Sequence, residues 1–113
     1  MQYLKKTNIL QIEQTKEGVL FNPAGFYTFR SRFTEKFNAV FLYYPPGIKN
    51  NPHSHEDLET IYFIVEGEGW VTVGEEQELL KKGDLVFIPK NTKHQVANRG
   101  KGSLALLEVT LQY

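Results

Sequence analysis

The stretch PPGIKNNPHSHEDLETIYFIVEGEGW, residues 45 to 70, decides how this chain folds. It begins at a corner rich in Pro and Gly, ends in an apolar run, and carries His53 and His55 between the two. Side chains at positions i and i+2 of a strand project from the same face. His53 and His55 are therefore predicted to point together, so that both imidazoles can reach one ion at about 2.0–2.1 Å.

The third and last histidine of the chain follows a later turn. A strand predicted over residues 85–88 ends at Pro89, the chain turns, and His94 begins the next predicted strand. In a closed sheet this later hairpin can bring His94 against the first pair. One site then explains every histidine in the chain.

Short runs rich in Val, Ile, Phe and Tyr recur along the chain and are separated by Gly, Pro and Asn, which is typical of an all-β sandwich or barrel. No window has sustained helical periodicity. We expect strands over residues 8–14, 25–33, 37–44, 53–55, 60–66, 69–74, 77–80, 85–88, 94–97 and 103–111. So many strands in 113 residues must close on themselves to hide their edges, as a double-sheet jelly roll does. The prediction is one domain, residues 1–113, with N-terminal strands in 1–36 and the barrel in about 37–111.

Side chains in these runs are predicted to fill the barrel or line a pocket. Aromatic residues dominate such cores, and the candidates are Phe41, Tyr43, Tyr62, Phe63, Trp70 and Phe87. Tyr62 shares strand parity with Thr60, which makes it the first candidate for substrate binding. Arg30 and Arg32 also share a strand face, where they either form a solvated outer surface or hold an anion.

The composition of the chain argues against several classes of binding partner. Thirteen basic residues balance thirteen acidic ones, so no basic excess attracts nucleic acid or anionic lipid. No apolar run is long enough to span a bilayer, and no secretory signal is recognisable. The absence of cysteine excludes disulfides and thiolate metal ligands. We expect a cytoplasmic protein with a small-molecule ligand and no nucleic-acid or membrane partner.

The spacing of these residues resembles the two sequence motifs of the cupin superfamily. The first motif is matched by Gly47, His53, His55, Glu59 and Gly67, and the second by Gly83, Pro89, Asn91, His94 and Asn98. The resemblance spans about residues 37–111 and implies a small single-domain cupin, a jelly-roll barrel that holds a divalent metal on His53, His55, His94 and a glutamate. The metal would be Fe, Mn, Zn or Ni, because a nitrogen-rich site without thiolates suits all four.

The chain departs from the family pattern at two places. Asn91 replaces a turn glycine, but Asn tolerates the left-handed conformation. The second departure concerns the glutamate ligand. Counting forward from His55 selects Glu59, whereas counting back from Gly67 selects Thr60, and adjacent strand residues face opposite ways. Either a bulge near Leu58 turns Glu59 inward, or Thr60 faces the site and no carboxylate ligand exists.

The resemblance implies several functions. The first is a metal-dependent enzyme with oxygenase-type chemistry on a small organic acid, a diketone or a related anion. The alternatives are a non-enzymatic binder of a sugar or metabolite, an isomerase of a sugar or keto acid, and a purely structural role for the histidines. We also expect a homodimer in which an N-terminal strand around Ile9, Leu10 and Ile12 extends the sheet of a neighbour.

Overall fold

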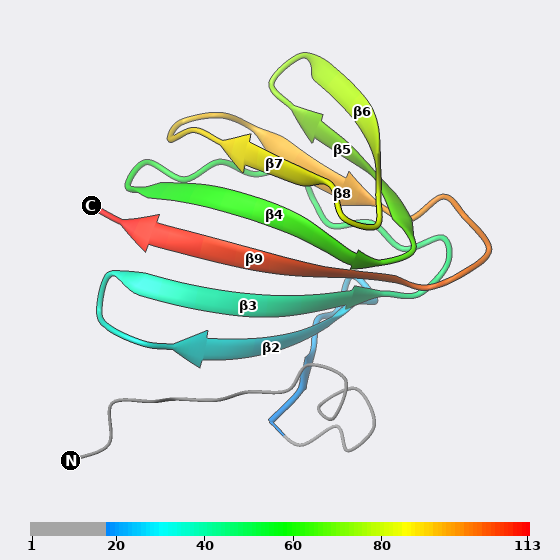
Figure 1. Cartoon of the computed structure of the whole chain (residues 1–113), viewed down its shortest axis with the longest axis horizontal. Helices are drawn as coiled ribbons and strands as arrows, with labels where there is room; N and C mark the ends of the chain where they lie inside the picture. Colours follow the sequence, from blue (N-terminus) through cyan, green and yellow to red (C-terminus); the bar gives the residue numbers. More distant parts are fainter. Residues whose placement is uncertain (1–17) are drawn as a thin grey trace.

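The computed structural model describes residues 18–113, which form nine strands and no helix (Figure 1). These strands are β1 (Leu20–Phe21), β2 (Tyr27–Arg32), β3 (Phe37–Tyr44), β4 (Leu58–Glu66), β5 (Glu68–Val73), β6 (Glu76–Lys81), β7 (Leu85–Ile88), β8 (His94–Ala97) and β9 (Leu104–Gln112). One sheet has six strands in the order β1-β2-β3-β9-β4-β7, and the other has three in the order β6-β5-β8. Neighbouring strands pair antiparallel, for example β3 with β9 and β5 with β8. The predicted all-β jelly roll is confirmed.

One expected strand is not formed. Residues 53–55 are not a strand, since His53 makes only an isolated bridge to His94. The strand expected over residues 8–14, with Ile9, Leu10 and Ile12, lies outside the described residues. Within residues 18–113 there is also no helix long and apolar enough to cross a membrane.

The core lies between the inner faces of the two sheets. Strand β4 shows the alternation clearly, because Thr60, Tyr62 and Ile64 are buried while Phe63 between them is 38% exposed. The largest buried apolar side chains at the centre of the molecule are Tyr44, Tyr62, Ile64, Ile88, Val96, Leu104 and Leu106. Burial of these faces provides the main drive for folding.

The prediction that six aromatic residues fill the interior is wrong for four of them. Tyr62 has the strand parity of the inner face and belongs to the core cluster, and Phe41 is 6% exposed although it has the opposite parity. The other four lie on the outer faces, namely Tyr43, Phe63, Trp70 and Phe87. Alternation shows which residues share a face of a strand, but both faces of these strands carry apolar residues, so the pattern alone does not select the inner one.

The inner face of the large sheet is apolar at one end and polar at the other. One row across the strands runs through Thr28, Leu42, Leu106 and Ile64, while two rows away lie Arg32, Asn38, Thr110 and Thr60. Asn38, Thr60 and Thr110 are nevertheless buried. A polar inner face in a small barrel is typical of a ligand cavity.

Gly67 in the turn between β4 and β5 gives a direct test of this packing. Its φ is +76°, and an added Cβ would overlap the backbone oxygen of Ser103. Gly83 has a φ of +93°, but a Cβ added there would meet nothing within 4 Å. We expect Gly83→Ala to cost about 1–2 kcal/mol of unfolding free energy from backbone strain, and Gly67→Ala to cost clearly more. Denaturant unfolding measures both, and equal losses would contradict the close approach of Ser103.

Candidate functional site

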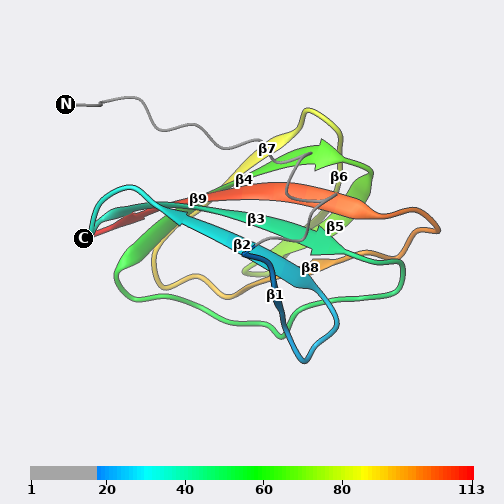
Figure 2. The same ribbon diagram turned by 90° about the horizontal axis from the view of Figure 1, so that it is seen from below.

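The loop of residues 45–57 carries the first two histidines and is fastened along β8. Figure 2 shows this loop running back beneath the large sheet, from the end of β3 to the start of β4. His53 and His94 exchange two backbone hydrogen bonds, with N···O distances of 3.1 and 2.8 Å. Further along, the backbone N–H of Asn50 donates to the carbonyl of Val96, whose own N–H donates to Oδ1 of Asn50. These bonds place the loop in one register against β8.

The three histidines meet in space. Their potential ligand atoms all lie within 4.8 Å of one another. The ring centroids of His53 and His94 are 4.3 Å apart, and those of His53 and His55 are 4.9 Å apart. Two nitrogens bound to one tetrahedral metal at about 2.0–2.1 Å are about 3.4 Å apart, so the most distant pair of ligand atoms would have to approach by about 1.4 Å to complete a shared site.

Hydrogen bonds orient two of these rings for ligation. Nδ1 of His53 lies 2.9 Å from the carbonyl oxygen of Asn51, and Nδ1 of His94 lies 2.9 Å from that of Thr92. A carbonyl oxygen only accepts, so each Nδ1 carries the proton and each Nε2 has a free lone pair. This is how metal-binding histidines are commonly held.

Nε2 of His94 is the atom that most directly indicates a bound metal ion. It is a buried polar atom without a hydrogen bond among the described residues. An unsatisfied buried polar group destabilises the folded state by about 1–3 kcal/mol. Burial lowers the pKa of His94 and of His55, and the neighbouring His53 acts in the same direction on both. His55 and His94 are therefore neutral near pH 7, as metal ligation requires. A divalent metal fits this donor set.

The structure also places both candidates for a fourth ligand. Thr60 is 2% exposed and shares the inner face of β4 with Tyr62, whereas Glu59 has the outward parity and pairs with Leu111. The irregularity in β4 lies between Ile64 and Glu66, so no bulge near Leu58 turns Glu59 inward. Glu59 is absent from the histidine cluster within residues 18–113.

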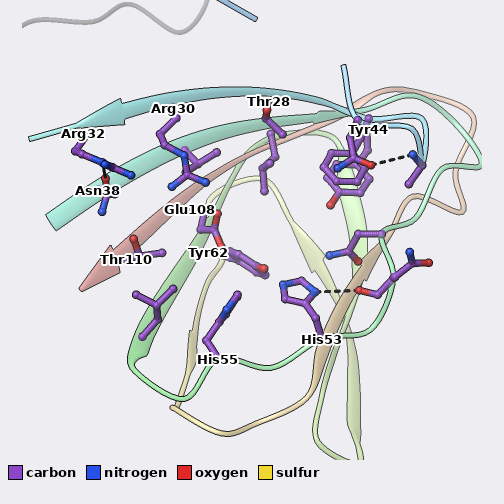
Figure 3. Close-up of a pocket in the computed structure, with 18 of the residues that line it drawn as sticks. Thr28, Arg30, Arg32, Asn38, Tyr44, His53, His55, Tyr62, Glu108 and Thr110 are labelled. Carbon is purple, nitrogen blue, oxygen red and sulfur yellow. Dashed lines mark hydrogen bonds between the residues drawn. The ribbon is translucent and has the colours of Figure 1, made fainter. Parts of the chain in front are cut away.

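A cavity of about 490 Å³ opens beside the histidines (Figure 3). Its lining includes His53, His55 and Tyr62, so the residue expected to contact substrate does face the cavity. Arg30 and Arg32 line it too and do not lie on the outer face. This volume lies within the range usual for small-molecule sites.

Glu108 on β9 is the residue that sequence reasoning missed. It lines the cavity between Val40 of β3 and Tyr62 of β4, on the inner face. Burial raises the pKa of Glu108, while Arg30 and His53 oppose that rise. A single carboxylate in the apolar run LALLEVTL was the available signal, since a strand with two apolar faces rarely includes a charge without a reason.

Comparisons with known proteins agree with this architecture. The chain matches the Cupin domain family over residues 40–110. An uncharacterized protein of Methanocaldococcus jannaschii is 41% identical over 63 residues, covering 56% of this chain and 50% of that protein. An oxalate-binding protein of Thermotoga maritima is 33% identical over 67 residues, covering 59% and 55%. The crystal structure of TT1209 from Thermus thermophilus has a TM-score of 0.76 at 31% identity, covering 86% of this chain and 92% of that one. The chain spans about half the length of the two curated relatives.

The outward position of Glu59 leads to a prediction about metal affinity. We expect Glu59→Gln to leave the affinity for Zn²⁺ within about twofold, because its carboxylate faces away from the histidines. Mutation of a residue that only hydrogen-bonds a metal ligand typically lowers metal affinity 10–100-fold. His55→Ala removes a ligand itself, so it should lower the affinity for Zn²⁺ by at least about 100-fold. Competition titration with a chromogenic chelator measures both. A tenfold loss in Glu59→Gln would show that its carboxylate reaches the ion.

Proposed function

The chain belongs to the cupin family, and on this premise we propose that it is a metal-dependent enzyme acting on a small organic acid. His53, His55 and His94 would hold a divalent transition metal. The observation that supports this most directly is the buried Nε2 of His94, which has no protein partner among residues 18–113 while its Nδ1 is held by the carbonyl of Thr92. The metal is Fe, Mn, Zn or Ni.

Three neutral imidazoles leave the full charge of the ion in the site. When bound, the metal supplies Lewis acidity or O₂ activation, according to its identity. The chain's own contribution is the orientation of the imidazole rings. The carbonyls of Asn51 and Thr92 orient the rings of His53 and His94. Tyr62 is buried on β4, beside Glu108 of β9. A site without a carboxylate ligand favours an anionic, chelating substrate.

The name of one relative supports the same ligand chemistry. The Thermotoga maritima protein is named an oxalate-binding protein, and oxalate is a small chelating dianion. That name also supports the second candidate, a binder that holds such an acid without converting it. Turnover of a bound acid by metal-loaded protein would separate the enzyme from the binder. A cytoplasmic location and the lack of nucleic-acid and membrane partners stay predictions.

We also propose a homodimer, formed through the outer face of the large sheet. Across that face Phe63 pairs in register with Leu85 and Leu107, and Ile61 pairs with Phe87 and Val109. Leu85 is 61% exposed and Phe87 51%. These two rows contain no charged side chain, so a second copy stacked on the same rows would bury apolar surface without desolvating a charge.

Metal ligation predicts a stability effect. An ion that binds only the folded state, at a hundredfold excess over its dissociation constant, adds about 2.7 kcal/mol. We therefore expect a chelator to lower the melting temperature of the wild type but not that of the variant His53→Ala/His55→Ala/His94→Ala. Elemental analysis of the purified protein identifies the ion. Identical melting with and without chelator, together with no bound metal, would refute the proposal.

The proposed dimer predicts a change in mass. Phe87→Glu places a charge in the middle of the apolar rows, which should weaken association by at least about a hundredfold, because burial of a charge without a partner costs several kcal/mol. Sedimentation should give the mass of two chains for the wild type and of one chain for Phe87→Glu. Leu20→Glu adds the same charge at an exposed position of β1, outside these rows, and should remain dimeric. A wild type with the mass of one chain would contradict the dimer.

A further inference from the structure

The polar end of the cavity is built as a row across the large sheet. Arg30 of β2 pairs with Val40 of β3, Val40 pairs with Glu108 of β9, and Glu108 pairs with Tyr62 of β4. All four therefore share the inner face, and all four line the cavity. Figure 3 shows the side chains of Arg30 and Glu108 directed toward one another, on the side of the cavity away from His53.

The charges that line this cavity favour an anion. Two arginines, Arg30 and Arg32, face one glutamate, Glu108, and no other lysine, arginine, aspartate or glutamate lines it among the described residues. The balance is one net positive charge before any metal is counted. Nε of Arg32 donates to Oδ1 of Asn38 at 3.2 Å, which fixes the plane of that guanidinium. A guanidinium group matches the geometry of a carboxylate, which it can hold through two parallel hydrogen bonds.

Glu108 adds a second requirement to the ligand. Within residues 18–113 no hydrogen bond to its carboxyl group accompanies its electrostatic interaction with Arg30. A hydroxyl group can donate to a carboxylate or accept from a carboxylic acid, so it suits Glu108 in either protonation state. A second carboxylate at the same place would be repelled by the ionised form.

We propose that the cavity binds a small hydroxylated carboxylic acid, whose carboxylate lies on Arg30 and Arg32 and whose hydroxyl group lies on Glu108. This inference rests on the proposed function, because the opposite end of the acid would reach the ion on the histidines. It assigns Arg30 and Arg32 to affinity and Glu108 to the choice between a hydroxy acid and a plain acid. None of the three is a metal ligand in this assignment.

The test uses three probes of matched size, namely racemic malate, succinate without the hydroxyl group, and malamide without the charges. Isothermal titration with Mn²⁺-loaded protein should show malate binding at least tenfold more tightly than either of the others. Arg30→Gln should weaken malate and succinate by about tenfold each. Glu108→Gln should bring the affinities for malate and succinate to within about threefold of each other.

Two control measurements separate this proposal from the metal site. The affinity for Mn²⁺ should stay within about twofold of the wild type in Arg30→Gln and in Glu108→Gln. The guanidinium of Arg99 lies over Trp70, outside the cavity, so Arg99→Gln should bind malate like the wild type. Equal affinities of the wild type for malate and succinate, or an unchanged malate affinity in Arg30→Gln, would overturn the proposal. If Mn²⁺ does not bind, the same titrations in metal-free protein still test the arginines, and only the metal-dependent function fails.

Discussion

The fastening of the loop of residues 45–57 along β8 is the constraint on which the candidate site depends. Among the described residues β8 is the only strand that forms β-bridges with this loop, and the two are joined by the mutual backbone hydrogen bonds of His53 and His94 and by the two bonds between Asn50 and Val96. The loop is also held nearer β4, where the carbonyl of His55 accepts from the N–H of Asn91 and the Asp57 carboxylate accepts from Gln112 of β9. Because these bonds fix the loop both at the level of the histidines and three residues before them, the rings meet without any metal being needed to gather them. Preorganisation of this kind lowers the free-energy cost of binding an ion.

Neutrality is the second property that the surroundings confer, in this case on His55 and His94. Burial disfavours their imidazolium forms and lowers their pKa values, and the neighbouring ring of His53 acts in the same direction. Burial also leaves Nε2 of His94 without a protein partner among the described residues. A neutral donor with one unsatisfied atom is suited to a cation, whereas ordinary core histidines have both nitrogens satisfied.

The large sheet separates two kinds of interaction onto its two faces. Its inner face contributes Arg30, Arg32 and Glu108 to the cavity. Its outer face carries exposed aromatic and aliphatic side chains, among them Phe63 and Phe87. A ligand and a second copy of the chain can therefore occupy the same sheet without competing, because successive side chains of a strand project to opposite sides.

The amino-acid sequence by itself determined most of the strands from Tyr27 onward, and the spacing that links His53, His55 and His94 to the cupin family, because these follow from local periodicity and from turn residues. Only the tertiary structure decided which face of each strand points into the barrel. The alternation of side chains groups the residues into two faces, but both faces carry apolar residues, so the pattern does not select the inner one. For this reason Phe63 and Phe87 were wrongly assigned to the core, and Thr60 rather than Glu59 could be placed on the inner face only once β4 had been paired with β7 and β9. The position of Arg30 and Glu108 in one row of the inner face likewise depends on β2, β3 and β9 lying side by side. The pairing of β3 with β9 joins strands that are distant in the sequence, and no local pattern encodes it.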